Sequence, residues 1–130
     1  MGKYDRVRQQ TGWGIPDRVR LAPDQVAELL ELTHDDDPLV RRVAAKNLCP
    51  CRMKRDVEPV WERLFEMTTD PDPGVRHDVV HALTDGSPRT YAAGVYEVID
   101  RMRNDPDRKL RKYVRYLAER QRRLGKVNVG

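Results

Sequence analysis

The sequence predicts an all-α solenoid of stacked helix pairs with a period of 35 residues. Shifted by 35 residues, the chain matches itself twice without a gap: Asp-Pro-Leu-Val-Arg at 37–41 becomes Asp-Pro-Gly-Val-Arg at 72–76 and Asp-Arg-Lys-Leu-Arg at 107–111. The apolar positions repeat in phase, as in the columns Val26, Trp61, Tyr96; Leu29, Leu64, Ile99; Leu32, Met67, Met102; Ala44, Val79, Val114; and Leu48, Leu83, Ala118. A fixed period in this range is typical of repeat proteins, in which each unit buries its apolar face only against its neighbours.

The composition favours a single elongated domain. At 130 residues the chain can build one domain with a modest core. Its residues are 38% hydrophobic, 6% aromatic and 35% charged, which suits a thin helical array with much surface per residue. No run approaches the ~20 apolar residues of a membrane-spanning helix. The N-terminus lacks the apolar stretch of a secretory signal, so we expect a cytoplasmic protein with no membrane partner.

The first unit is expected to contain two helices. The first helix begins near Pro23, because proline is pre-set for a first helical turn. Asp37 then caps the second helix, with Pro38 in its first turn. The second helix runs from Leu39 to about Leu48, and Pro50 stops it.

The two later units repeat this plan. In the second unit we predict helices at Val57–Met67 and Pro73–Leu83. In the third we predict a helix at Pro88–Arg103 and a longer one from about Asp107 to Leu124, ended by Gly125.

These units define the expected domain organisation. Residues 22–130 form one repeat domain, with repeats at about 22–55, 56–90 and 91–126, preceded by a basic N-terminal arm or cap at residues 1–21. Charge is distributed unevenly: residues 56–90 hold three basic and eight acidic side chains, whereas residues 91–130 hold eleven basic and five acidic ones. The net charge of +4 therefore hides basic ends around an acidic middle.

At the Asp-Pro-x-Val-Arg step the chain resembles the HEAT-repeat family of α-solenoids, particularly its short bacterial members, over roughly residues 22–124. The resemblance implies a right-handed α-solenoid of about three HEAT-like helix pairs, whose second helices line the inner, concave side. It also implies that the Asp and Arg of each step are scaffold residues that tie neighbouring turns together: Asp37 and Arg41, Asp72 and Arg76, Asp107 and Arg111. The third unit departs from the pattern, with Arg108 in the place of proline.

The outward columns of the second helices form a candidate binding surface. Elimination of the core columns leaves Arg42, His77 and Lys112 in one column, Lys46, His81 and Tyr116 a turn later, and Ala45, Val80 and Arg115 beside them. We call the polar and aromatic members the inner strip: Arg42, Lys46, His77, His81, Lys112, Arg115 and Tyr116. Such a mostly basic surface could hold phosphates or an acidic peptide or helix, and solvated helix faces would show the same pattern.

A second candidate surface is the basic C-terminal helix. Residues 108–126 contain nine basic side chains and one acid, with two tyrosines between them. A basic helix with interleaved aromatic residues could follow a sugar–phosphate backbone, and Trp13 among the arginines of the N-terminal arm could stack on bases. The nucleic-acid candidates are Trp13, Arg108, Arg120, Arg122 and Arg123. Cations near the end of a helix are also favoured by the helix dipole alone.

The cysteines suggest a metal site only weakly. Cys49 and Cys51 with His77 and His81 would supply two thiolates and an i, i+4 histidine pair, which is tetrahedral zinc chemistry. Their spacing matches no established zinc module, so we expect no bound metal and no cofactor.

The sequence contains no catalytic set. It has no His-Glu dipeptide, nucleophile–base pair, glycine-rich phosphate loop or carboxylate dyad. We therefore expect a non-catalytic adaptor that presents a concave, mostly basic helical surface to a protein partner. The alternative is a factor that binds nucleic acid or a ribonucleoprotein through the C-terminal helix and the N-terminal arm.

Overall fold

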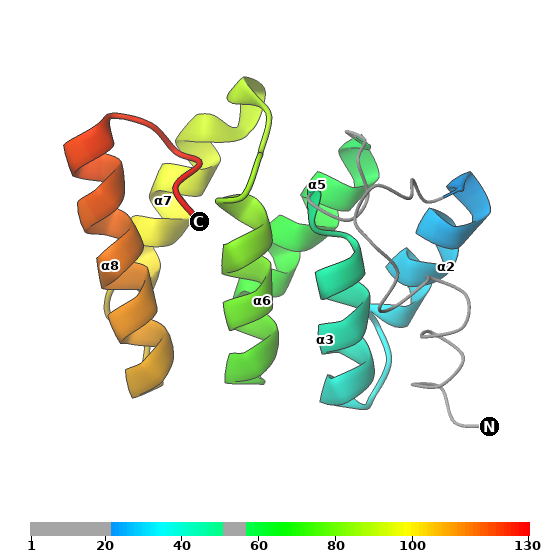
Figure 1. Cartoon of the computed structure of the whole chain (residues 1–130). Helices are drawn as coiled ribbons and strands as arrows, with labels where there is room; N and C mark the ends of the chain where they lie inside the picture. The colour runs from blue at the N-terminus through cyan, green and yellow to red at the C-terminus, as the bar shows by residue number, and fades with distance from the viewer. Residues whose placement is uncertain (1–21, 51–56) are drawn as a thin grey trace.

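The structure, a computed structural model, describes residues 22–50 and 57–130, and within them it contains six α-helices and no strands (Figure 1). The helices are α2 (Pro23–Leu32), α3 (Pro38–Asn47), α5 (Glu58–Glu66), α6 (Pro73–Leu83), α7 (Ala92–Met102) and α8 (Arg108–Leu124). The all-α expectation is confirmed. In the described part of the chain no helix is long and apolar enough to cross a bilayer.

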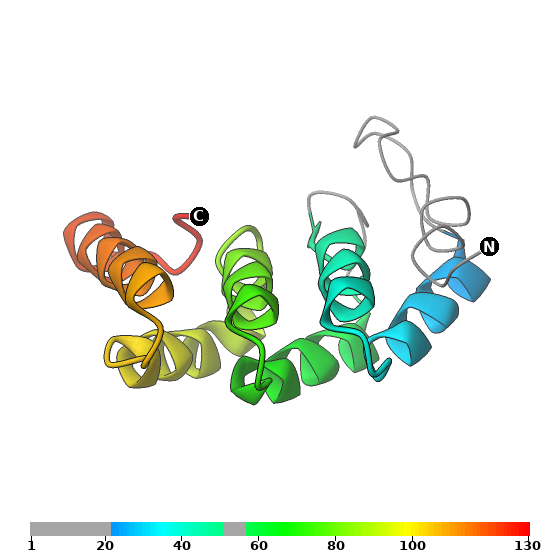
Figure 2. The ribbon, with the colours of Figure 1, turned by 90° about the horizontal axis from the view of Figure 1, so that it is seen from below.

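The helices form two layers. Figure 2 shows α2, α5 and α7 along an outer arc, with α3, α6 and α8 on its inner side. Each outer helix is followed by an inner one, so the fold is a stack of helix pairs, as in a solenoid. The handedness of the stack and a regular period for the whole array stay predictions.

Aspartates cap the inner helices. The side chains of Asp37, Asp72 and Asp107 accept hydrogen bonds, each 2.9 Å long, from backbone N–H groups in the first turns of α3, α6 and α8. Each cap satisfies a donor that the helix itself leaves unpaired, and such a cap stabilises a helix by about 1 kcal/mol. At the other end of α8, Gly125 adopts φ +65°, the left-handed conformation that glycine accommodates best. The predicted Asp37 cap and the Gly125 stop are confirmed.

Two of the outer helices, α5 and α7, are shorter than predicted. The helix expected at Pro88–Arg103 is a 3₁₀ turn at Arg89–Tyr91 followed by α7. Tyr91 packs there against Trp61 and Phe65, with ring centroids 5.8 and 5.9 Å apart, and this aromatic contact between repeats accompanies the tighter turn. The predicted Val57–Met67 helix likewise ends at Glu66, and a 3₁₀ turn follows at Met67–Thr69.

The predicted apolar columns form the core, except at the end of the stack. Val26 and Trp61 are buried, whereas Tyr96, the next member of their column, is 42% exposed. Tyr96 lies on the last outer helix, where no further repeat of the described chain covers it.

Two equivalent arginines join the repeats. Arg41 Nε and Nη2 donate to the two carboxylate oxygens of Asp70 at 2.9 and 3.0 Å, and Arg76 binds Asp105 in the same way at 3.1 and 2.9 Å. Arg111 repeats the contact that its counterparts make with the preceding turn, donating to the carbonyl oxygens of Asp105 and Pro106. We call this set the arginine ladder.

The arginine ladder refines the scaffold expectation. The arginines tie turns together as expected, but the carboxylates that bind them are Asp70 and Asp105, while Asp37, Asp72 and Asp107 cap helices. The signal was present in the sequence, because Asp35, Asp70 and Asp105 also recur 35 residues apart.

The last residues fold back onto the inner side of the stack. Val127 and Val129 are buried, Gly130 N donates to the carbonyl of Thr84 at 2.9 Å, and Asn128 Oδ1 accepts hydrogen bonds from the backbone N–H groups of Gly86 and Ser87 (Figure 1). We call residues 126–130 the C-terminal tail. This contact was not predicted from the sequence, because a short segment without periodicity carries no signal of where it packs.

Candidate functional site

The inner strip begins with an ion pair between the first two repeats. Arg42 Nε, from α3, donates to Asp78 Oδ2, from α6, at 2.9 Å, and the Asp78 side chain is 5% exposed. Burial raises the pKa of Asp78, but the neighbouring His77 and Arg42 side chains outweigh this and hold the pKa below its usual value. Arg42, predicted as a surface cation, is therefore largely neutralised by its partner.

Between the second and third repeats, the positions that correspond to Arg42 and Asp78 hold His77 and Tyr113, which form an aromatic contact. The rings of His77 and Tyr113 lie 4.6 Å apart between centroids, tilted by 32°. The Tyr113 hydroxyl also lies 3.5 Å from His81 Nδ1. Burial raises the pKa of Tyr113, and the nearby Asp85 carboxylate raises it further, so the phenol is protonated at neutral pH. His77 and His81 of the inner strip thus both contact Tyr113 of the next repeat, and we call these three residues the central cluster.

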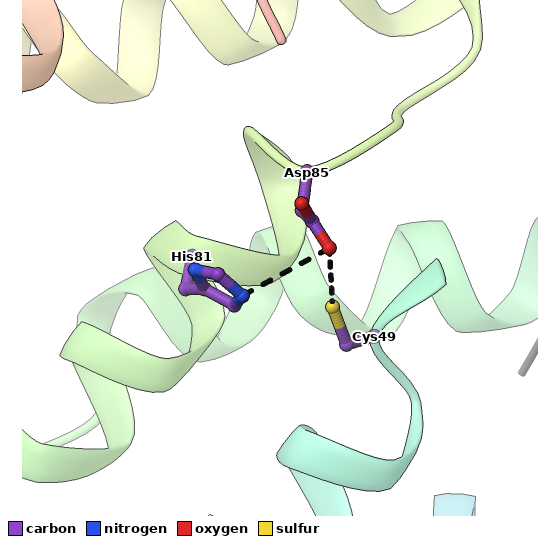
Figure 3. A group of neighbouring side chains, drawn as sticks. All are labelled: Cys49, His81 and Asp85. Carbon is purple, nitrogen blue, oxygen red and sulfur yellow. Dashed lines mark hydrogen bonds and ion pairs between the residues drawn. The ribbon is translucent and has the colours of Figure 1, made fainter. Parts of the chain in front are cut away.

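Three potential metal ligands meet beside this centre. The Cys49 thiol donates to Asp85 Oδ2 at 3.3 Å, and His81 Nε2 lies 3.9 Å from the same oxygen (Figure 3). One ligand atom from each of the three residues lies within 4.8 Å of the other two. Cys49 is buried just after α3, whereas His81 and Asp85 are partly exposed at the end of α6.

This group differs from the predicted metal ligands. His77 lies one turn away on α6 and contacts Asp78 and Tyr113 instead, and Cys51 lies outside the described residues. Asp85 was not among the predicted ligands. It follows Cys49 by 36 residues, and the same offset joins Arg42 to Asp78.

The remaining inner-strip residues divide into two groups. Lys46, Lys112 and Tyr116 are exposed on α3 and α8. Arg115 instead donates to the carbonyl of Arg103 at 2.9 Å, at the end of α7, so it lies apart from the histidines.

The prediction that Ala45, Val80 and Arg115 form one outward column is wrong for the first two residues. Ala45 and Val80 were expected to face outward, but both are fully buried and belong to the core. In the last repeat the same position is exposed, so an arginine can occupy it. Spacing of four places residues on one stripe, but it does not say which stripe the neighbouring repeat covers.

The basic C-terminal helix is only partly open. Arg108 and Arg123 are exposed, whereas Arg122 forms an ion pair with Glu119 and Arg120 lies 5.6 Å from the centre of the Tyr116 ring. Trp13, the aromatic candidate in the N-terminal arm, lies outside the described residues.

Comparison with known proteins defines the family. A family model described as HEAT repeats matches residues 26–119, which is most of the chain, whereas no curated protein and no solved structure matches it. HEAT repeats generally mediate protein–protein interactions and are typically non-catalytic. The stacked helix pairs, the arginine ladder and this match lead to one conclusion: the chain belongs to the HEAT-repeat family.

Proposed function

We propose that this protein is a non-catalytic adaptor of the cytoplasm that binds a protein partner along the inner strip. The observation that carries the proposal is the central cluster of His77, Tyr113 and His81, which two successive repeats build on the inner layer of helices. Aromatic and imidazole groups offer large contact areas at a low entropic cost, which favours a binding role for this surface.

The surface is held by rigid elements. The arginine ladder joins each repeat to the next through paired hydrogen bonds on mostly buried side chains. A preformed surface loses little conformational entropy on binding, so more of the contact energy remains for affinity.

The charges favour a protein over a nucleic acid. Lys46 and Lys112 place cations on the first and third inner helices, but the middle repeat contributes Asp78 and Asp85 between them. Asp78 is buried and paired with Arg42, but the partly exposed Asp85 carboxylate would repel a phosphate backbone, whereas a peptide or helix with acidic ends and a neutral centre would fit. We therefore propose an acidic or amphipathic protein segment as the partner.

The test is a nuclease-treated pull-down with charge-reversed variants of the full chain. The inner-strip variant is Lys46→Glu with Lys112→Glu, and the matched control is Arg89→Glu with Arg103→Glu, two exposed arginines flanking α7. We expect a defined protein partner that the control retains and the inner-strip variant loses. A partner retained by the inner-strip variant would place the interface elsewhere.

The alternative function is binding of nucleic acid or a ribonucleoprotein through α8. The exposed Arg108, Lys112 and Arg123 favour it, because exposed cations on one helix can contact successive phosphates. In this case affinity for single-stranded RNA should fall steeply with salt, and the variant Arg108→Glu with Arg123→Glu should bind far more weakly than the Arg89→Glu and Arg103→Glu control. Companions that disappear after nuclease treatment would favour this function over the adaptor.

A further inference from the structure

The cluster of Cys49, His81 and Asp85 has the composition of a zinc site. Thiolate and imidazole are ligands that Zn²⁺ favours in proteins, and a carboxylate oxygen commonly completes such a set. A site for Ca²⁺ or Mg²⁺ would instead consist of oxygen ligands. From this donor set and its geometry we propose that Cys49, His81 and Asp85 bind one Zn²⁺ ion and so join the first repeat to the second.

The distances fit a tetrahedral ion with small adjustments. Zinc lies about 2.3 Å from sulfur and about 2.0–2.2 Å from nitrogen or oxygen, so two ligands of a tetrahedron are roughly 3.3–3.7 Å apart. Cys49 Sγ and Asp85 Oδ2 are 3.3 Å apart, and His81 Nε2 and Asp85 Oδ2 are 3.9 Å apart. The third pair, Cys49 Sγ and His81 Nε2, lies within 4.8 Å, so a side-chain movement of about 1 Å would bring all three ligands onto one ion.

The elements place the ligands securely. His81 and Asp85 are four residues apart at the end of α6, and Cys49 follows α3 in the neighbouring repeat. Cys49 is 2% exposed, whereas the His81 side chain is 44% exposed, so the site has a buried thiol and an open side. Solvent can therefore reach a fourth coordination position.

The second nitrogen of His81 has a partner that supports metal binding. Its Nε2 faces the cluster while Nδ1 lies 3.5 Å from the Tyr113 hydroxyl. A histidine ligand generally has its other ring nitrogen hydrogen-bonded, which fixes the orientation of the ring. Tyr113 comes from α8, so all three repeats contribute to the site.

Binding changes the protonation of one group. Without an ion, the Cys49 thiol donates a hydrogen bond to Asp85 Oδ2. When Zn²⁺ binds, the thiol proton is released to solvent and the ion takes its place between sulfur and carboxylate. Binding should therefore weaken as the pH falls, and no redox step is involved.

The experiment titrates the reduced full chain with Co²⁺ and then displaces it with Zn²⁺. We expect one ion per chain and a thiolate-to-cobalt charge-transfer band that disappears when Zn²⁺ is added. The variants His81→Gln and Asp85→Asn should each weaken binding at least tenfold, and Tyr113→Phe should weaken it by roughly tenfold. The matched control is His34→Gln, which removes an exposed histidine that lies outside the cluster, just after α2.

The thiol is tested by Cys49→Ser, which should abolish the charge-transfer band, and by Cys51→Ser, which should retain it. Because Cys49 is buried, far-UV circular dichroism must show that the Cys49→Ser variant is folded. If that variant is unfolded, His81→Gln tests the same site, because it changes a partly exposed side chain. Absence of stoichiometric uptake, a band that survives in Cys49→Ser, or equal affinity in His81→Gln and His34→Gln would each overturn the proposal. None of these measurements needs a partner protein, so they stand apart from the adaptor function.

Discussion

The two junctions of the inner layer use the same positions for different chemistry. Between the first and second repeats, Arg42 pairs with Asp78 and Cys49 with Asp85. Between the second and third repeats, His77 contacts Tyr113 at the positions that correspond to Arg42 and Asp78. The positions that correspond to Cys49 and Asp85 hold Thr84 and Arg120, and both bind the C-terminal tail. There Gly130 N donates to the Thr84 carbonyl, and Arg120 Nε donates to the Val129 carbonyl at 3.3 Å.

The arginine ladder, in contrast, is the same at both junctions. Arg41 and Arg76 each bind one aspartate of the next repeat through two hydrogen bonds. In both, Nη1 also donates to backbone carbonyls of the preceding turn. Stacking is therefore encoded by positions that do not change, while the inner face is free to vary from one junction to the next. We infer that the specific properties of this protein lie in the varied positions.

The largest effect is expected from breaking the ladder. Arg76→Ala leaves the Asp105 carboxylate, 7% exposed, with the Asp107 N–H but without its cationic partner, and loss of one member of a buried ion pair costs about 3 kcal/mol. Arg41→Ala should cost a similar amount, because its geometry is the same. Urea unfolding followed by circular dichroism measures both.

Arg111→Ala is the matched control for the ladder. Among the described residues Arg111 contacts only carbonyl oxygens of the preceding turn, so we expect a loss of about 1 kcal/mol. Equal losses for Arg76→Ala and Arg111→Ala would mean that the carboxylate of the next repeat contributes nothing to stacking.

The Arg42–Asp78 pair should make the first junction sensitive to acid. Asp78→Asn is expected to reduce stability by about 2 kcal/mol at neutral pH, because a hydrogen bond between two charged groups is lost. The pKa of Asp78 is lower in the folded chain than in the unfolded one. Its stabilisation is therefore complete above the unfolded pKa of about 3.9 and is lost as the pH falls through the lower, folded value.

The measurement is the stability difference between the wild type and Asp78→Asn as a function of pH. The difference should be constant from pH 7 to about 5 and shrink below about 4. Tyr113→Phe, at the corresponding position of the second junction, should show no such dependence. A difference that stays constant down to the lowest pH would contradict the lowered pKa.

The C-terminal tail should contribute less. Val127→Ala removes two buried methyl groups, and at ~0.8 kcal/mol for each we expect a loss of about 1.5 kcal/mol. Asn128→Ala removes the acceptor of the Gly86 and Ser87 N–H groups, but this side is open to water, so about 1 kcal/mol is expected. Thermal unfolding of both variants tests whether the tail is part of the second junction; unchanged midpoints would show that it is not.

The sequence was sufficient for the repeated features and insufficient for the varied ones. The helices, the Asp37 cap and the apolar columns followed from periodicity, because each repeat needs the same local structure. The neutralisation of Arg42 did not follow, because it depends on a single aspartate in the next repeat. Nor did the burial of Val80 or the role of Asp85, since one-dimensional spacing shows the stripe of a helix but not the distance to its neighbour.

The smallest effect on stability is expected at the exposed face of α8. Glu119 accepts hydrogen bonds from Arg122, and these bonds lower the pKa of the Glu119 carboxyl, but both side chains lie in solvent. Water and salt screen such a pair, so Glu119→Gln should leave the unfolding midpoint unchanged. The same change frees Arg122 and removes the only acid between residues 108 and 126. If α8 binds RNA, Glu119→Gln should tighten that binding and steepen its salt dependence. Unchanged binding would favour the inner strip, where the two junctions differ, as the site of recognition.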